Sequence, residues 1–353
     1  MHVHLISADG PELGCRLALA DQHRGAEADS PTAVFDLTGE QLLAAWEPAP
    51  AQLRTFEAVP VALGLWEQLE PRLEGWFRLL QLAEREALLI PPLPGVEALL
   101  QCLFLAEQLD TLAPTSDRVS VLMPPPSQAM ALLELARTGP DLVEGLLDPV
   151  LSWWDHTRQS LGGLEKLVGL DLPNSSSLRL EAAWRGRLEQ MGSWLNASNS
   201  HQLTLALEAK KERGGMLRHR MSRFALRGTH PTRVLLHGVG DLAMGEEINA
   251  LLKETAIAVA VVPTAATLEE LASLLDQEPE VRGDVDVDVE AGTMSITLAG
   301  VRREELQVRQ LKGVVVLLCG GYRRILQLPE ALAHSKCSGA KLENGRLELR
   351  FKG

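Results

Sequence analysis

The sequence predicts an α/β protein that combines a parallel sheet, a helical insertion lobe and a C-terminal antiparallel β-sandwich. Three observations lead to this fold class. Short β-rich runs alternate with helical segments over the first 275 residues, and long helical tracts at about 40–116 and 128–200 interrupt the alternation. Beyond residue 283 the pattern changes to strict two-residue alternation and hairpins.

Six strands are expected in the first domain, and each is followed by a segment with apolar residues at helical spacing. They lie at Val3–Ser7, Ala33–Leu37, Ser120–Met123, Leu203–Leu207, Val234–His237 and Ala256–Val262. Strands joined by helices of this length run parallel, because a parallel pair needs a long crossover connection. The two helical tracts then form a separate lobe on this sheet.

The last 70 residues predict the sandwich. The stretch "DVDVDVEAGTMSITLAG" alternates, "LQVRQLKGVVVLLCGGYRRILQLP" contains two or three strands, and Asn344-Gly345 is a hairpin turn. Residues 282–353 carry twelve Lys and Arg against nine Asp and Glu, a net +3, which leaves −16 on the rest. We therefore place the domain boundary within 275–284, with domains at 1–275 and 283–353.

Composition excludes several classes of protein. A net charge of −13 argues against a nucleic-acid partner. The longest apolar stretches are far shorter than the ~20 residues of a membrane span, and no signal peptide is apparent, so a cytoplasmic protein is expected. The four cysteines are widely separated, which predicts reduced thiols with no metal site, and counts against a thiol-bound metalloid.

The N-terminal stretch "MHVHLISADGPELGCRLALADQH" is a strand, a glycine-containing turn and a helix, which is how a phosphate-binding loop begins. The turn has no lysine. His2 and His4 alternate along the same strand, and they are either a metal pair lacking a third ligand or ordinary histidines at the edge of the core.

The C-terminal domain resembles the α-crystallin domain of small heat-shock proteins. The resemblance rests on "ITLAGVRREELQVRQLKGVVVL", "YRRILQLPEAL" and "CSGAKLENGRLELRF", with the A-G-V pattern at Ala299–Val301, R-x-x-x-L-P at Arg324–Pro329 and the last pattern at Asn344–Phe351. The chain stops at Gly353, before that family's Ile-x-Ile type segment, so large shell-like assemblies are not expected.

An α/β domain followed by such a module resembles the arsenite-pump (ArsA-like) ATPase family, which includes the ATPase that targets tail-anchored membrane proteins. The branch with this module is typical of cyanobacteria and plastids. The run "PPLPGVEALLQCLFLAEQL" resembles the family's P-G-x-x-E-A run at Pro94, Gly95 and Glu97. The resemblance implies a P-loop NTPase-like sheet, a homodimer and a lobe that binds apolar helices.

The nucleotide residues implied by the resemblance are almost all replaced. The family's G-K-G-G-V-G-K-[ST] loop falls on Ala8 through Cys15: Gly10 keeps a glycine, but the two lysines become Asp9 and Gly14 and the magnesium-binding hydroxyl becomes Cys15. Gly10, Gly14 and Cys15 are thus the remains of a phosphate loop. Among the switch residues, Met123 replaces the acid, His237 replaces the adenine-reading asparagine, and Asp36 remains as a vestigial catalytic candidate.

Client binding has its best candidates in "DLVEGLLDPVLSWWDH", which has more apolar surface than one core-facing helix needs. The residues are Leu146, Leu147, Val150, Trp153 and Trp154. They form a groove for a client, as in the targeting relatives, or a core or dimer interface. The basic run at 210–227 either meets an anionic membrane surface peripherally or is the solvated face of a helix that packs on the acidic sheet domain, with Leu217, Met221 and Phe224 on one face.

Two functions remain from different classes. The first is a degenerate ArsA-like protein without a cofactor, which holds apolar segments of client proteins as a chaperone or targeting factor does. The second is an ATPase that still binds ATP and magnesium through the amides of Gly10 and Gly14, with Asp36 activating water. The lost lysines favour the first, because phosphoryl transfer depends on cations placed around the phosphates.

Overall fold

The computed structural model describes residues 2–27, 32–47, 49–50, 52–79, 96–112, 116–142, 148–168, 175–177, 182–196, 201–209, 214–238, 257–263, 265–276 and 284–352. Its contacts divide the chain into two compact units. One comprises Met1–Thr55, Ala113–Glu134 and Leu195–Gly353, and the other comprises Phe56–Leu112 and Leu135–Trp194. The first unit contains the α/β sheet together with the C-terminal module, and the second is helical.

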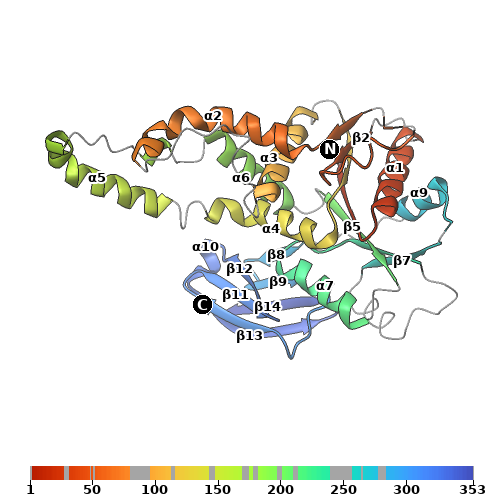
Figure 1. Ribbon diagram of the computed structural model, residues 1–353. Helices are drawn as coiled ribbons and strands as arrows, with labels where there is room; N and C mark the ends of the chain where they lie inside the picture. The colour runs from red at the N-terminus through yellow and green to blue at the C-terminus, as the bar shows by residue number, and fades with distance from the viewer. Residues whose placement is uncertain are drawn as a thin grey trace. The chain divides into compact units, whose positions relative to one another are not determined.

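The first unit is built on a parallel seven-stranded sheet with the order β3-β2-β4-β1-β5-β6-β7 (Figure 1). The strands are β1 (His2–Ala8), β2 (Thr32–Asp36), β3 (Leu53–Thr55), β4 (Arg118–Leu122), β5 (His201–Glu208), β6 (Arg233–His237) and β7 (Ala258–Val262). All six expected strands form. The edge strand β3 was not predicted, because three half-exposed residues leave no periodic signal in the sequence.

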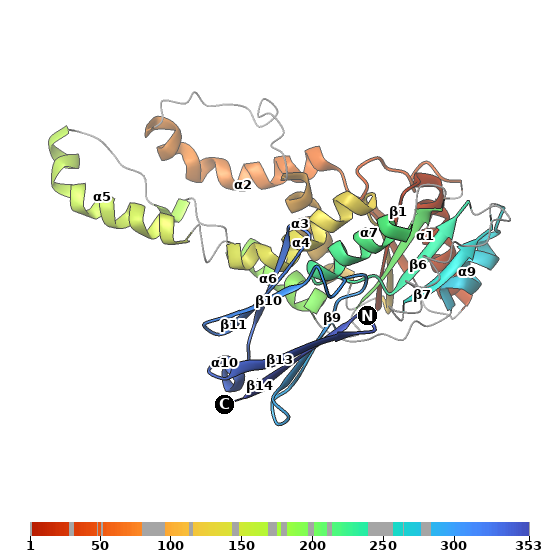
Figure 2. The same ribbon diagram turned by 90° about the horizontal axis from the view of Figure 1, so that it is seen from below.

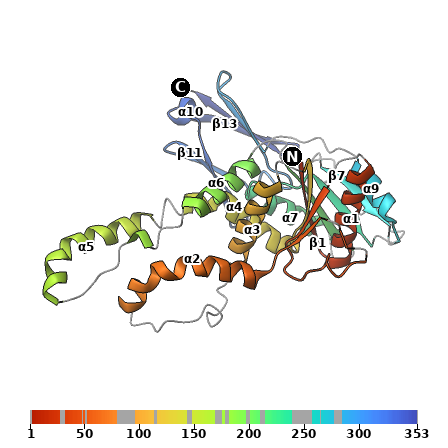
Figure 3. The same ribbon diagram turned by 90° about the horizontal axis from the view of Figure 1, so that it is seen from above.

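Helices α1 (Pro11–Glu27) and α9 (Leu268–Asp276) lie side by side against the sheet (Figures 1 and 3). Their apolar residues share one core with the sheet, including Leu17, Leu235 and Leu271, all with 0% exposure. The strand β1 at the centre pairs with β4 on one side and β5 on the other. Its carboxyl end and the turn into α1 are thereby fixed between two neighbouring strands.

The C-terminal module consists of two antiparallel sheets, as the predicted β-sandwich requires. One has the order β13-β14-β9-β8 and the other β10-β11-β12. The elements are β8 (Val285–Asp288), β9 (Thr293–Thr297), β10 (Gln307–Leu311), β11 (Val314–Cys319), β12 (Tyr322–Gln327), α10 (Glu330–Ala333), β13 (Lys336–Glu343) and β14 (Arg346–Lys352). The predicted hairpin forms between β13 and β14, with positive φ at Asn344 and Gly345.

The helix α7 (Gly214–Leu226), which follows β5, packs on the sandwich. Its residues Ala225 and Leu226 belong to the same apolar core as Ile296, Leu317 and other sandwich residues. The module therefore shares buried surface with the chain segment that leaves the parallel sheet.

The helical unit contains α2 (Ala58–Leu79), α3 (Val96–Leu112), the end of α4 (Pro126–Leu142), α5 (Asp148–Val168), a 3₁₀ turn (Ser175–Ser177) and α6 (Ala182–Asn196). Figures 2 and 3 show α3, α4 and α6 grouped together. Arg187 of α6 reaches Glu107 of α3 at 3.2 Å, and Phe56 meets Phe104 edge-on with ring centroids 5.7 Å apart. No helix in the described ranges is long and apolar enough to span a membrane.

Candidate functional site

The turn at the carboxyl end of β1 is only two residues long. Asp9 and Gly10 connect β1 directly to α1, which starts at Pro11. The amide of Gly14 donates to the carbonyl of Gly10 at 3.2 Å, as in an ordinary helix. A phosphate-binding loop instead wraps successive free amides around the anion. Three of the positions that the resemblance gives to that loop, from Pro11 to Leu13, are therefore the first turn of a helix.

The next two loop positions, Gly14 and Cys15, face the core. A Cβ at Gly14 would lie 2.9 Å from Cδ1 of Leu122, so a larger residue here would have to displace that side chain where α1 packs on β4. Cys15 is buried in the core cluster. Burial and the nearby Asp36 carboxylate raise the pKa of the Cys15 thiol to about 11, so the thiol is neutral at pH 7.

Asp9 is bound within the protein. Its Oδ1 accepts a hydrogen bond from the Arg220 guanidinium of α7 at 2.8 Å, and its Oδ2 accepts one from the amide of Glu208 at 3.3 Å. Asp9 is 14% and Arg220 25% exposed. A carboxylate and its own counter-ion thus stand where the resemblance implies the family's signature lysine.

Asp36, the vestigial catalytic candidate, is fully buried at the end of β2. Its Oδ1 accepts hydrogen bonds from the amide of Thr38 at 3.0 Å and from the Thr38 hydroxyl at 2.5 Å. Its Oδ2 accepts one from the amide of Leu43 at 2.9 Å. Both carboxylate oxygens therefore hold the loop that follows β2.

The other two nucleotide positions also have backbone roles. Met123 is buried, and its amide donates to the carbonyl of Ile6 at 2.7 Å. His237 ends β6, and its carbonyl accepts a hydrogen bond from the amide of Ala209 at 2.8 Å. Met123 has no carboxylate, which the family's pattern places at its position, and His237 has no side-chain amide to read adenine.

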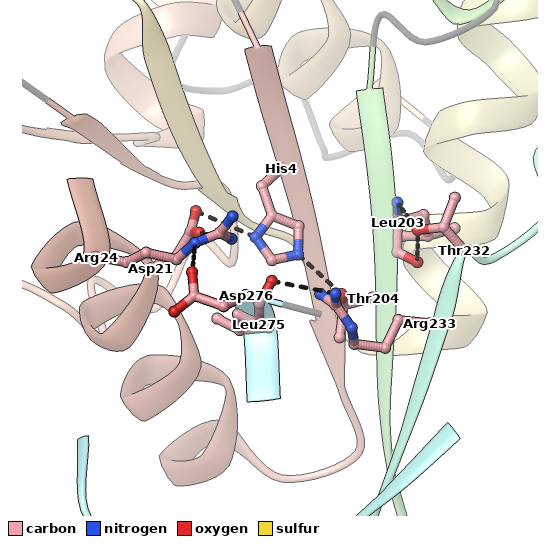
Figure 4. Close-up of polar contacts among 9 residues, drawn as sticks. All are labelled: His4, Asp21, Arg24, Leu203, Thr204, Thr232, Arg233, Leu275 and Asp276. Carbon is pink, nitrogen blue, oxygen red and sulfur yellow. Dashed lines mark hydrogen bonds and ion pairs between the residues drawn. The ribbon is translucent and has the colours of Figure 1, made fainter. Parts of the chain in front are cut away.

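A buried polar network that the sequence did not predict surrounds His4 (Figure 4). The Nε2 atom of His4 lies 2.8 Å from the Thr204 hydroxyl, and Nδ1 lies 3.1 Å from Asp21 Oδ2. Arg24 joins Asp21 at 3.5 Å and also pairs with Asp276, while Arg233 donates to the carbonyl of Leu275.

This network bears on the metal-pair hypothesis for His2 and His4. Both ring nitrogens of His4 face protein groups, and no group of three or more His, Cys, Asp or Glu able to hold a metal is found in the part of the chain that the structure describes. The sequence signal for Asp21 is its position four residues after Leu17, which places a charged residue on the buried side of α1. The network joins α1, β1, β5, β6 and α9.

The client-binding candidates lie on or just before α5. Val150 is 54% and Trp153 65% exposed, whereas Trp154 is half-buried and the intervening Leu151 is buried. Leu146 and Leu147 lie outside the described residues. The helix therefore buries one apolar side and presents Val150 and Trp153, three residues apart, on another.

The basic run is largely engaged with protein groups where it is described. Leu217, Met221 and Phe224 are completely buried, as the packing alternative expected. Arg223 and Arg227 lie over the Tyr322 ring of the module, 5.0 and 5.1 Å from its centroid. Residues 210–213 are outside the described residues.

Two positions of the α-crystallin-like pattern hold α7. Gly300 has φ +77°, and a Cβ there would lie 2.7 Å from the carbonyl oxygen of Arg218. The Arg324 guanidinium donates to the carbonyl of Ala225 at 2.9 Å and pairs with Asp284. A cation on a carbonyl near the C-terminus of α7 is favourable for the helix dipole.

Comparison with known proteins bears on the family. Residues 291–351 match the family model described as an HSP20-like domain found in ArsA. An uncharacterized protein of Streptomyces coelicolor is 27% identical over 355 aligned residues, which cover 94% of this chain and 87% of the relative. The match to the C-terminal module, behind a P-loop-like parallel sheet, supports the expected relationship to ArsA-like proteins.

Proposed function

We propose that this protein is a cytoplasmic ArsA-like protein that has lost ATP binding and hydrolysis and holds apolar segments of client proteins, as a chaperone or membrane-protein targeting factor does. The observation that carries the proposal is the two-residue β1–α1 turn with its Asp9–Arg220 ion pair. Such a turn has no loop of free amides for an anion. It also has no lysine, and its nearby cation, Arg220, is already paired with Asp9.

The magnitudes favour loss of nucleotide binding. A charge-assisted hydrogen bond contributes about 1.5–3 kcal/mol, so two absent lysines remove roughly 3–6 kcal/mol. A micromolar site has about 8 kcal/mol in total. The Asp9 carboxylate would also repel phosphate oxygens, and binding would require Arg220 to leave its partner.

Calorimetric titration of the full chain with magnesium ATP tests this part of the proposal. We expect no binding heat at about 100 μM nucleotide, because roughly 2–5 kcal/mol of binding free energy would remain, which corresponds to a dissociation constant of about 0.2 mM or weaker before the repulsion by Asp9 is counted. Turnover above background would contradict it, above all if Asp36→Asn abolished the turnover while leaving the melting temperature unchanged. That result would favour an ATPase that uses Asp36 as its water-activating carboxylate.

Client binding rests on the exposed side of α5. An indole that is 65% exposed next to an exposed valine is costly in water and gains about 25 cal/mol for each Å² that a partner covers. An apolar helix of a client protein can lie along such a surface, with side chains at i, i+3 and i+4 as its contacts. We propose that a homodimer brings two such surfaces together.

A fluorescent leucine-rich helical peptide serves as the client probe. We expect Trp153→Ser with Val150→Ser to weaken its binding at least tenfold, which corresponds to about 1.4 kcal/mol. Gln159→Ser, a change at an exposed polar position of α5, is the matched control. Unchanged binding would refute the site. If the variant instead reduced the light-scattering mass from about twice 38.5 kDa to a monomer, the surface would be a dimer interface.

A further inference from the structure

The outer face of the three-stranded sheet in the module is unusually apolar. Strand register places three rows of side chains on this face. The rows are Gln307, Leu318 and Arg323; Arg309, Val316 and Ile325; and Leu311, Val314 and Gln327. Five of these nine side chains are aliphatic, and we call the nine positions the β11 face.

The outer face of the opposite sheet has the composition that a solvated surface requires. Its paired positions include Asp286, Ser295, Glu348 and Lys341 in one row, all polar. Sandwich strands normally alternate between an apolar inner side and a polar outer side. The outer faces of the two sheets of this module therefore differ in composition: one is polar, and the other is mostly aliphatic.

The central strand β11 is apolar on both sides. Its inner residues Val315, Leu317 and Cys319 are buried in the sandwich core, as the alternating pattern requires. Its outer residues Val314, Val316 and Leu318 are aliphatic as well, and only half-buried. A strand that is apolar on both sides is typical of a sheet covered on both sides.

Neighbouring strands extend this surface. Ile325, directly opposite Val316, is 51% exposed, and Leu311, opposite Val314, is 61% exposed. With strands about 4.8 Å apart and about 3.3 Å of rise per residue, the β11 face measures roughly 15 Å in each direction, on the order of 250 Å². This area is just below that of the largest apolar patch on a typical soluble monomer, and such a patch is often a functional surface.

Charge and area together indicate what covers the β11 face. Its charged positions are Arg309 and Arg323, and no Asp or Glu stands among the nine. A second copy of this face would bring no carboxylate to pair with these arginines, and it would bury far less than the ~800 Å² per partner of a stable dimer. A single helix, which is about 10 Å wide, fits the area.

We propose that the β11 face binds an amphipathic helix of a partner protein, with aliphatic side chains over Val316 and Ile325 and carboxylates next to Arg309 and Arg323. The inference deepens the proposed client binding and rests on it, because it gives the module a binding surface of its own and defines the charge of the segment bound. Helices cover apolar sheet faces in this way within proteins.

The experiment compares two synthetic helical peptides with the same leucine stripe on the full-length protein. One carries glutamates beside the stripe, and the other carries lysines at the same positions. We expect the acidic peptide to bind at least tenfold more tightly. Val316→Thr with Ile325→Thr should weaken its binding at least tenfold, and Arg309→Gln with Arg323→Gln should remove the preference for the acidic peptide.

The matched control is Lys341→Gln with Glu348→Gln on the opposite outer face, which should leave binding unchanged. Equal binding of both peptides, or wild-type binding by the threonine variant, would overturn the proposal. The proposal would also be overturned if the threonine variant kept peptide binding but lost binding to phosphatidylserine vesicles, which would make the face a lipid-binding surface. It would be overturned too if the variant became monomeric, which would make the face a dimer interface. If the threonine variant fails to fold by circular dichroism, the arginine variant decides by keeping or losing the preference.

The same titrations separate this inference from the proposed function. The α5 variant Trp153→Ser should weaken binding of an apolar peptide whatever its flanking charge, because no charged partner is invoked on α5. If Trp153→Ser weakened peptide binding and the β11-face variants did not, only the proposed binding site on the β11 face would be contradicted. If peptide binding were unchanged in both the α5 variant and the β11-face variants, the proposed client binding as a whole would be contradicted.

Discussion

At the scale of single residues, the polar groups at the carboxyl edge of the sheet are already bonded within the protein. Asp9 pairs with Arg220, and Asp36 accepts three hydrogen bonds from Thr38 and Leu43. A carboxylate that activates water must be within reach of that water, and Asp36 is 0% exposed. Asp9 and Asp36 therefore stabilise the fold, and this role does not require a nucleotide.

Replacement of Asp36 by alanine should destabilise the fold. The change leaves the buried amide of Leu43 and the Thr38 hydroxyl and amide without their acceptor, which costs about 2–4 kcal/mol in the free energy of unfolding. Urea denaturation measures this cost. Asp286→Asn, at an exposed ion pair with Arg346, is the control and should cost less than about 1 kcal/mol. Unchanged stability in Asp36→Ala would contradict the structural role.

The network around Asp21 predicts a loss of stability in acid. Burial alone would raise the pKa of Asp21, but His4, Arg118 and Arg24 outweigh it, and the pKa lies below its usual range. The unfolded chain has a pKa of about 3.9, so the stabilisation is complete above about pH 5 and is lost as the pH falls through the lower pKa of the folded state.

Unfolding free energies measured between about pH 2.5 and 6 test this prediction. We expect a decline in acid for the wild type, and a shallower decline for Asp21→Asn, which cannot titrate. The variant should also be less stable at pH 7, because Arg24 and His4 lose a buried partner. Parallel pH curves for the two proteins would show that Asp21 is not the group responsible.

At the scale of elements, α7 connects the parallel sheet to the sandwich. Near its middle, Arg220 holds the β1–α1 turn, and at its end Ala225 and Leu226 enter the sandwich core. The Gly300 loop and Arg324 then contact its backbone directly. The α-crystallin-like pattern residues are thus used to seat a helix of the same chain.

Two glycines in the module provide a matched test of that seating. Gly300 and Gly321 both have positive φ, +77° and +82°, but only Gly300 has backbone atoms within 4 Å of an added Cβ. Gly321→Ala should cost about 1 kcal/mol of conformational strain. Gly300→Ala should cost roughly 3 kcal/mol or more, since α7 must also move away. Equal costs in thermal or urea unfolding would mean that the loop does not pack tightly on α7.

At the scale of the whole molecule, the module and the sheet fall in one compact unit, while α2, α3, α5 and α6 form the other. Residues 282–353, which include the module, have a net charge of +3, and the remaining chain has −16. Screening over about 8 Å at physiological salt limits that attraction, so the apolar contacts of α7 must supply most of the affinity.

Truncation after Glu280 tests how the module contributes. The remaining chain should keep a folded α/β domain but expose Ala225 and Leu226, which the sandwich core now covers. We expect increased binding of a hydrophobic dye, a lower melting temperature and faster aggregation than in the full chain. A truncated protein that matched the full chain in solubility and thermal stability would show that the module is an independent appendage.

The sequence by itself determined the architecture, because strand and helix periods, the Asn344-Gly345 turn and the absent lysines are local features of the chain. Among the described strands of the parallel sheet, β3 was missed because it is too short to show a period. Tertiary structure decided the partners of the site residues. Asp9 and Arg220 are 211 positions apart, and His4 and Thr204 are 200 apart. Such pairs meet because parallel strands bring distant segments together, which no local pattern encodes. The exposure of Trp153 and Ile325 was likewise decided by packing, since periodicity shows that a face is apolar but not whether the fold covers it.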